Sequence, residues 1–282
     1  MPLFHALREF GGAARREQLL ARGIRRWQLD SALKAGAITR PHRGVYSLPE
    51  TSRDIVHARI FRASLACVSA CEAYGLPVLE RDHRTHLATE CPRSMARPGI
   101  RPMDEVHIHL SSWSEKGALR VEPWVAIDQA GECVSPIAQL ALVDAALSRG
   151  LMTMEQIGWF TRTPIKRRIW LRQAANAGAE SPLETVARIR LRRAGFGLEC
   201  QVPIEGVGRV DLLVEGRVVV ELDGRAYHQD PEAFAKDRRR DRTLQILGYK
   251  VARFTWAEVM EDGRVLETAV AALLRQTNRL AA

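Results

Sequence analysis

The stretch RVDLLVEGRVVVELDG, residues 209–224, decides the fold of the last part of the chain. Two apolar runs flank Gly216, which predicts a β-hairpin that turns at this glycine. In a register centred on Gly216, Asp211 lies opposite Glu221, and Asp223 follows two residues later on the same face. The opposite face is filled by Leu212, Val214, Val218, Val220 and Leu222. Three carboxylates therefore converge on an otherwise apolar strand pair.

Three adjacent carboxylates beneath covering helices cannot all stay ionised without a cation. A hard divalent ion is the natural partner for such oxygen ligands, and Mg²⁺, or Mn²⁺ in its place, suits them. An ion of this kind activates water and neutralises the charge that develops on a phosphate during cleavage. The pattern predicts a catalytic metal site with Asp211, Glu221 and Asp223 as ligands.

The segments around the hairpin complete a domain of about a hundred residues. Ser181-Pro182-Leu183-Glu184 predicts the start of a helix, with Ser181 as N-cap and Glu184 in a capping box, and Gly195 ends it. Further elements are expected as strands at 198–204, 209–215 and 217–223, a helix at 231–247, a strand at 250–254 and a helix at 265–276. This α-β-β-β-α-β-α order is that of the restriction-endonuclease-like core.

RVDLLVEGRVVVELDGRAYH, followed by KDRRRDRTLQILGYKVARFTW, resembles a bacterial PD-(D/E)XK domain family related to very-short-patch-repair endonucleases. The resemblance covers about residues 179–276. It implies that Asp211 is the motif's Asp, Glu221 its Glu, and Glu184 the acidic residue of the first helix. Asp223 stands where the motif has a Lys that orients the attacking water, which puts catalysis in doubt.

Members of this branch commonly show Glu-x-Asp-Gly with a His a few residues on. The resemblance therefore implies His228 as a water-activating base and Arg225 as a substitute for the missing lysine. Two structural alternatives stay open: Glu184 also fits a purely capping role, and His228 also fits a structural hydrogen bond.

The stretch AKDRRRDRTLQ, residues 235–245, is a basic helix beside the predicted site. A solvated face with internal ion pairs explains part of it, and Asp237 with Arg240 has the required spacing. The remaining arginines are expected to contact DNA phosphates along the rim of the site. They are Arg238, Arg239 and Arg242, together with Arg253 from the following strand.

Residues 1–49 read as short helices followed by a hairpin with a basic turn, the plan of a winged helix-turn-helix. The expected recognition helix, 25–35, has an apolar set on or near its buried side: Trp27, Leu29, Leu33 and Ala35. A recognition helix enters the major groove, and a wing touches the backbone or the minor groove. The predicted DNA-binding residues are Arg25, Arg26, Gln28 and Lys34 on the helix, and Arg40, His42 and Arg43 in the wing.

The segment GGAARREQLLARGIRRWQLDSALKAGAITRPHRGVYSLP, residues 11–49, resembles the N-terminal winged helix of AbiEi-type antitoxins. These proteins are transcriptional repressors of toxin–antitoxin pairs, so the resemblance implies DNA binding. The alternative is a winged helix used only for packing or protein contacts.

The pattern of apolar residues over 50–177 predicts an α/β middle domain. A long helix is expected over 57–75, strands at 86–89, 106–110 and 124–126, and helices at 136–148, 154–160 and 164–173. No acid–base pair, activated nucleophile or phosphate loop appears there. The small polar stretch 174–180 is expected to be a linker to the last domain, 178–282.

The five cysteines are scattered and odd in number, so they do not predict a disulfide framework. Cys67 and Cys71 would share a helical face, and histidines and Cys91 follow them. A zinc site there is conceivable, but no second pair completes a ligand spacing. His107 and His109 alternate with apolar residues, which favours the polar face of a strand over metal ligands.

Lys and Arg outnumber Asp and Glu by 42 to 33, giving a net charge of +9. This excess favours a polyanionic partner, although a merely solvated basic surface is the competing interpretation. No signal peptide or membrane span is expected, so the predicted location is cytoplasmic. A homodimer is left open.

Together these features predict a Mg²⁺- or Mn²⁺-dependent DNA endonuclease with a winged helix that binds or orients DNA. The alternative is a non-catalytic DNA-binding regulator of antitoxin type with a degenerate nuclease domain. Position 223 separates the two, because a Lys there would have favoured catalysis. Substrate preference, including DNA against RNA, is not readable from the sequence.

Overall fold

The computed structural model describes residues 2–90, 103–110, 118–223, 231–260 and 263–280. Contacts within the chain define two compact units, Met1–Ser135 with Glu155–Arg168, and Pro136–Met154 with Ile169–Ala282. Within the described ranges, no helix has the length and apolar character needed to cross a membrane. The three domains expected at 1–49, 50–177 and 178–282 stay a prediction.

The first unit begins with a winged helix, as predicted. Its strands form one antiparallel sheet in which β3 lies between β1 and β2. Leu7, Leu19, Leu29 and Tyr46 lie in its buried core. Its elements are α1 (Pro2–Glu9), β1 (Ala13–Arg15), α2 (Arg16–Ala21), α3 (Arg26–Lys34), β2 (Thr39–His42) and β3 (Val45–Ser47). The sequence did not indicate β1, because three residues are too few to show a period.

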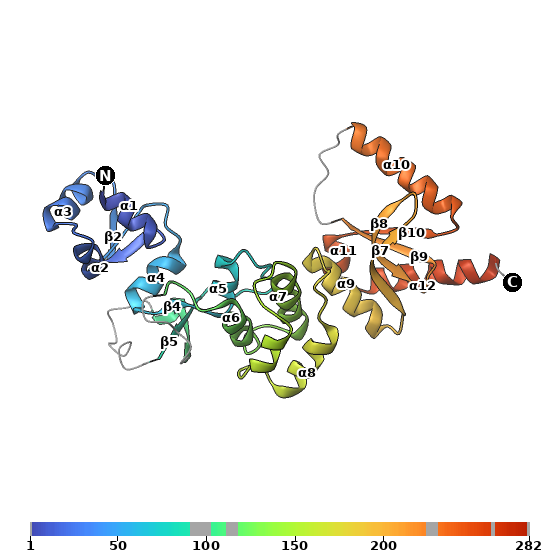
Figure 1. The fold of residues 1–282 in the computed structure, drawn as a ribbon, viewed down its shortest axis with the longest axis horizontal. Helices are drawn as coiled ribbons and strands as arrows, with labels where there is room; N and C mark the ends of the chain where they lie inside the picture. The colour runs from blue at the N-terminus through green and yellow to red at the C-terminus, as the bar shows by residue number, and fades with distance from the viewer. Residues whose placement is uncertain (1, 91–102, 111–117, 224–230, 261–262, 281–282) are drawn as a thin grey trace. The chain divides into compact units, whose positions relative to one another are not determined.

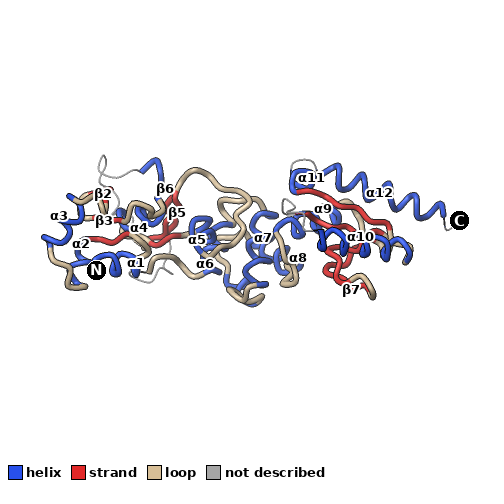
Figure 2. The backbone as a smooth tube through the Cα atoms, turned by 90° about the horizontal axis from the view of Figure 1, so that it is seen from above, coloured by secondary structure: helices blue, strands red, loops and turns tan. Residues whose placement is uncertain are grey.

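A second sheet follows in the same unit, with strand order β4-β5-β6 and β5 parallel to β6 (Figure 2). Its strands are β4 (Ser64–Leu65), β5 (Thr85–Thr89) and β6 (Val106–Leu110), and its helices are α4 (Arg53–Phe61), α5 (Cys67–Ala73) and α6 (Pro123–Ala130). The strands expected at 86–89 and 106–110 are confirmed.

Two predictions for this region are wrong. The helix expected over 57–75 is broken, because Arg62 adopts a left-handed φ of 54° and β4 then pairs with β5. The strand expected at 124–126 lies inside α6, which begins with Pro123 at its first turn. In both places tertiary pairing and helix-start chemistry outweigh the local apolar pattern.

Helix α4 is anchored to the winged helix rather than set apart from it. The buried Arg59 guanidinium donates to the carbonyl oxygens of Ala13 at 3.0 Å and Phe10 at 2.8 Å. Because these carbonyls belong to the first fifteen residues, residues 53–61 pack as part of the N-terminal structure.

The second unit contains the predicted α-β-β-β-α-β-α order around a four-stranded sheet, β10-β9-β8-β7. Only β10 and β9 run parallel in that sheet. The elements are α7 (Pro136–Ser148), α9 (Pro182–Arg193), β7 (Leu198–Ile204), β8 (Gly208–Val214), β9 (Val218–Asp223), α10 (Pro231–Ile246), β10 (Lys250–Thr255), α11 (Trp256–Met260) and α12 (Gly263–Leu280). Between α7 and α9 the chain forms η3 (Glu155–Trp159), a 3₁₀ turn of the first unit where a helix was expected, and then α8 (Ile165–Ala174).

The sheet is covered on both faces. Figure 1 shows α10 on one side of the strands and α9 with α12 on the other. Leu213 and Val219 pack with Leu244 of α10, so the face that carries the predicted carboxylates is apolar near the hairpin turn. The polar part of this face is therefore limited to the end of the hairpin away from Gly216.

Helices α7 and α9 are joined by a buried ion pair. Arg188 donates to Asp144 at 2.6 Å and to the carbonyl oxygen of Ala174 at 2.5 Å, and both charged side chains are 1% exposed. Asp144 also accepts from the Thr185 hydroxyl and from the backbone of Asn176, each at 2.8 Å. The stretch 174–180, expected to be an open linker, is thus held against α7.

Candidate active site

The hairpin register predicted from the sequence is confirmed. Leu212 pairs with Val220, Leu213 with Val219 and Val214 with Val218. The turn contains Glu215 at φ 50° and Gly216 at φ 63°, left-handed conformations that favour glycine. This turn fixes which side chains of β8 and β9 share a face.

Asp211 lies one residue beyond the last of these backbone pairs. Its carboxylate accepts a hydrogen bond from the backbone N–H of Leu222 at 2.9 Å. This contact draws the Asp211 side chain across to β9, beside Glu221. The two predicted ligands therefore lie next to each other at the end of the hairpin.

Arg240 of α10 faces Glu221. Its guanidinium donates to the Glu221 carboxylate at 2.8 Å and also to the carbonyl oxygen of Arg209. The Arg240 Nε is buried with no hydrogen-bond partner. The spacing in the sequence predicts Asp237 as a partner of Arg240, but the side chain of Asp237 lies outside the described residues. Arg240 brings a positive charge into the carboxylate site without a metal.

Burial raises the pKa values of both carboxyl groups. Desolvation is the largest cause for Glu221, whose pKa rises to about 7, and it exceeds the opposing effect of Arg240. The pKa of Asp211 is also raised, again chiefly by desolvation. Asp223, at the end of β9, adds repulsion to both groups. A divalent cation beside these buried carboxyl groups would stabilise their ionised forms more than it stabilises an exposed carboxylate.

Glu184 contacts both the start of α9 and the neighbouring strand β7. Its backbone N–H donates to the N-cap Ser181 at 3.2 Å, and its carboxylate accepts from the backbone of Glu180 at 3.1 Å. The carboxylate also accepts from the Gln201 side chain of β7 at 2.7 Å. Burial raises the Glu184 pKa, and repulsion from Asp211 contributes. Glu184 is therefore close enough to Asp211 for their charges to interact.

Gln201 is a residue that the sequence did not indicate. The β7–β8 pairing continues on both sides of it, from Cys200 with Leu212 to Val202 with Val210, which places Gln201 opposite Asp211. Its φ is 53°, a strained value for a residue with a side chain. A single glutamine in a strand carries no recognisable pattern, so only the fold reveals it.

The remaining predicted residues are distributed as follows. Arg238, Arg239 and Arg242 are exposed on α10, whereas Arg253 forms a two-point ion pair with Asp241 at 3.0 and 2.5 Å. Arg225 and His228 lie outside the described residues. Among the described residues, these carboxylates do not form a group of three or more closely spaced potential ligands. The ligand set stays a prediction.

A pH effect on stability follows from Glu221 in metal-free protein. Its pKa of about 7 lies above the ordinary 4.5, so its contribution is fully present below pH 4.5 and is lost as the pH rises through 7. Glu221→Gln should raise the free energy of unfolding at pH 8 in EDTA by ~1–3 kcal/mol, and have little effect at pH 4. Denaturant unfolding at both pH values measures this. Glu205→Gln, at an exposed position, is the control, and a destabilised Glu221→Gln protein at pH 8 would contradict the expectation.

The predicted DNA-binding residues of the winged helix mostly face solvent. Exposed side chains are those of Arg25 at the N-cap of α3, Arg26 and Lys34 of α3, and Arg40 and Arg43 of the wing, while Gln28 and His42 are half-buried. The Gln28 side chain accepts from the backbone of Arg25 at 2.8 Å, so it caps the helix.

The prediction that Trp27 lies on the buried side of the helix is wrong, because its side chain is 64% exposed. Leu29 is buried as predicted, at 1% exposure, whereas Ala35, expected on the same side, is exposed.

Changing Arg25 and Arg26 together to Ala should weaken duplex DNA binding and reduce the salt slope by about two, and Arg43→Ala by about one. Fluorescence anisotropy over a range of salt concentrations measures the slope. Arg22→Ala is a matched control, since Arg22 is paired with Glu9. Equal losses for Arg22 and for the Arg25–Arg26 pair would contradict the predicted interface.

The fold and these side chains define a winged-helix domain and a restriction-endonuclease-like domain on one chain. Residues 2–49 match the family model AbiEi_4, described as transcriptional regulator, AbiEi antitoxin. Residues 184–274 match the restriction-endonuclease-like family model REase_MTES_1575. The resemblances seen in the sequence are thus confirmed at both ends of the chain. A comparison with curated proteins gave no significant match.

Proposed function

We propose that this protein is a divalent-metal-dependent DNA endonuclease whose winged helix binds or orients the DNA. The observation that carries the proposal is the adjacent placement of Asp211 and Glu221, both with raised pKa values, in a restriction-endonuclease-like domain. Domains of this type generally use divalent metal ions. Neighbouring buried carboxyl groups with raised pKa values are more frequent at functional sites than elsewhere.

The donor atoms are of the kind that hard divalent cations prefer. Asp211, Glu221 and Asp223 offer carboxylate oxygens. Glu184 lies close enough to Asp211 for their charges to interact. A bound Mg²⁺ or Mn²⁺ would supply Lewis acidity toward the phosphodiester and lower the pKa of a water molecule. The protein's own residues fix the carboxylates: the backbone of Leu222 orients Asp211, and Gln201 orients Glu184.

Arg240 has two roles in this proposal. Without a metal, it offsets the charge of Glu221. With a metal and DNA bound, its guanidinium is placed to interact with a phosphate beside the carboxylates. This second role supplies a cation near the site, which the motif's lysine supplies in other PD-(D/E)XK domains and which Asp223 cannot supply here.

The second candidate is a DNA-binding regulator of antitoxin type with a degenerate nuclease domain. Two observations favour it: the matched AbiEi antitoxin-type domain and the Arg240–Glu221 ion pair, which satisfies the carboxylate without metal. In that case residues 184–274 would serve as a scaffold or a partner-binding platform. This candidate predicts DNA binding that is indifferent to metal and to Asp211.

The test is hydrolysis by purified full-length protein. Linear, supercoiled, single-stranded and branched DNA are incubated with Mg²⁺ or Mn²⁺ at pH 8, and with EDTA. The nuclease proposal expects strand breaks that need the metal and that EDTA stops. If every DNA substrate stays intact and calorimetry detects no binding of Mg²⁺ or Mn²⁺, the result would favour the regulator over the nuclease.

A further inference from the structure

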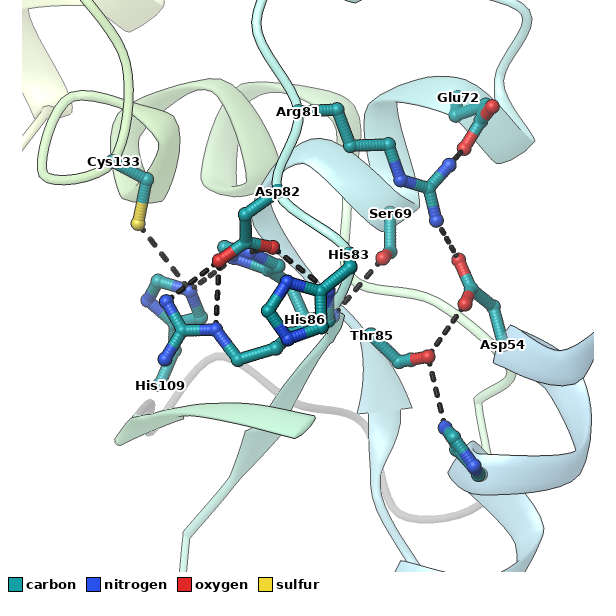
Figure 3. A network of polar contacts seen from close by, with 12 residues as sticks. Asp54, Ser69, Glu72, Arg81, Asp82, His83, Thr85, His86, His109 and Cys133 are labelled. Atoms are coloured by element: carbon teal, nitrogen blue, oxygen red, sulfur yellow. Dashed lines mark hydrogen bonds and ion pairs between the residues drawn. The ribbon is translucent and has the colours of Figure 1, made fainter. Parts of the chain in front are cut away.

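Two cysteines and two histidines meet in the first unit, whereas the carboxylate site belongs to the second. Cys67, His86, His109 and Cys133 place one potential ligand atom each within 4.8 Å of one another. Figure 3 shows His86, His109 and Cys133 turned toward a common point. Cys67, His86 and His109 are buried, whereas Cys133 is exposed.

Four different parts of the chain contribute to this cluster. Cys67 begins α5, His86 lies on β5, His109 lies on the parallel strand β6, and Cys133 follows α6. Cys67 has a left-handed φ of 47°, and its backbone N–H donates to Gln129 of α6 at 3.1 Å. Such a conformation costs about 1–3 kcal/mol in a residue that is not glycine, so the surrounding structure holds the Cys67 side chain in place.

The two imidazole rings face each other through one nitrogen each, His86 Nδ1 and His109 Nε2, here called the inner nitrogens. His86 Nδ1 lies 3.1 Å from His109 Nε2. The outer nitrogens face carboxylates: His86 Nε2 is 3.2 Å from Asp82, and His109 Nδ1 is 3.7 Å from Glu132. A carboxylate only accepts, so both outer nitrogens are the ones expected to carry hydrogens.

This arrangement leaves a lone pair on each inner nitrogen when both rings are neutral. If His109 instead carried its hydrogen on Nε2, its Nδ1 lone pair would face the Glu132 carboxylate. A cation between the rings gives both inner lone pairs a partner and leaves both outer N–H groups facing the carboxylates. Metal-ligating histidines characteristically donate their outer N–H to a carboxylate, carbonyl or water, and His86 is placed to do so toward Asp82.

The distances fit a tetrahedral ion. Two nitrogens bound to zinc at ordinary bond lengths lie about 3.3 Å apart, close to the spacing of the inner nitrogens. Cys133 Sγ lies 4.0 Å from His109 Nε2, slightly more than the ~3.6 Å of a closed site. Two thiolates with two imidazoles select zinc over the hard cations Mg²⁺ and Ca²⁺.

We propose that Cys67, His86, His109 and Cys133 bind one zinc ion that joins α5, the β5–β6 pair and the end of α6. Four protein ligands fill a tetrahedral shell, so the ion is structural and has no open position for water. The site is independent of the nuclease proposal, because its ligands belong to the first unit and the carboxylates to the second.

Metal analysis of the full-length protein tests the proposal. Protein purified without chelator is expected to carry one zinc per chain, and Asp211→Asn should carry the same amount, which excludes the carboxylates as its holders. His109→Ala and Cys133→Ser should lose most of the zinc after dialysis. His107→Gln is the matched control, because His107 stacks on His86 with centroids 4.8 Å apart but is outside the cluster. It should keep the zinc, and loss from His107→Gln as well would overturn the ligand assignment.

Cobalt substitution gives a second measurement that does not depend on how variants fold. The wild-type Co²⁺ protein should show a thiolate-to-metal charge-transfer band with the intensity of two thiolate ligands. Absence of bound zinc together with absence of this band would overturn the proposal. A Cys67–Cys133 disulfide in freshly purified protein, seen by mass spectrometry after alkylation, would also overturn it.

Discussion

Asp211→Asn is expected to lower DNA cleavage by at least ~10²–10³-fold, the scale associated with losing one electrostatic contact to the transition state. The substitution keeps the shape of the side chain and its acceptance of the Leu222 N–H, but removes a negative ligand. Affinity for Mg²⁺ or Mn²⁺ should fall with it. DNA affinity should stay the same or rise, because repulsion of the phosphate is relieved.

Cleavage rates, calorimetric metal binding and DNA anisotropy on the same preparation separate these effects. Glu205→Gln removes an exposed carboxylate in the same domain and should leave all three unchanged. If Asp211→Asn and Glu205→Gln cleave equally well, Asp211 is not part of the active site. If Asp211→Asn binds DNA more weakly than the wild type, the Asp211 carboxylate contributes to folding or to DNA docking and not to the cleavage step.

The second large effect concerns stability. Asp144→Ala should lower the free energy of unfolding by about 3–5 kcal/mol, because it leaves the fully buried Arg188 guanidinium without its counter-charge. Arg188→Ala should cost a similar amount for the reciprocal reason. Denaturant unfolding at pH 7 measures both.

Changing both partners to apolar residues, Asp144→Leu with Arg188→Met, is the control. It should be far less harmful than either single change, since no unpaired charge is left buried. The same ion pair predicts that residues 136–282 fold better than residues 178–282, which lack α7. A stable fragment 178–282 with native-like near-ultraviolet circular dichroism would contradict a structural need for α7.

The C-terminal domain could be predicted from sequence because its signals are local. The glycine turn fixed the hairpin register, and the alternation of apolar residues placed Asp211 and Glu221 on one face. Ser181 and Pro182 marked the start of α9 by capping chemistry alone. Each of these inferences needed only a few neighbouring residues.

The contacts of the site could not be predicted, because they connect distant residues. Arg240 reaches Glu221 from α10, and Gln201 reaches Glu184 from β7. Charge patterning along one helix suggests Asp237 as a local partner for Arg240, but it cannot indicate a partner on another element such as Glu221. Only the packing of α10 on the sheet shows that contact.

The cysteine–histidine cluster was missed for a related reason. Ligand spacing in sequence identifies zinc sites built on one hairpin or one helix, whereas these ligands come from four separate elements. His109 was expected on the polar face of a strand and is instead 4% exposed. Alternation showed correctly that the β6 histidines share a face, but could not show that α6 and its following loop cover it.

The most direct measurement for the central claim is strand breakage in supercoiled plasmid by wild-type protein and Asp211→Asn, purified in parallel. Parallel purification matters because a contaminating nuclease would appear equally in both samples. The nuclease proposal predicts nicks with Mg²⁺ or Mn²⁺ for the wild type, none with EDTA, and none above background for Asp211→Asn. Plasmid left intact by the wild type, or nicked equally by both proteins, would contradict it.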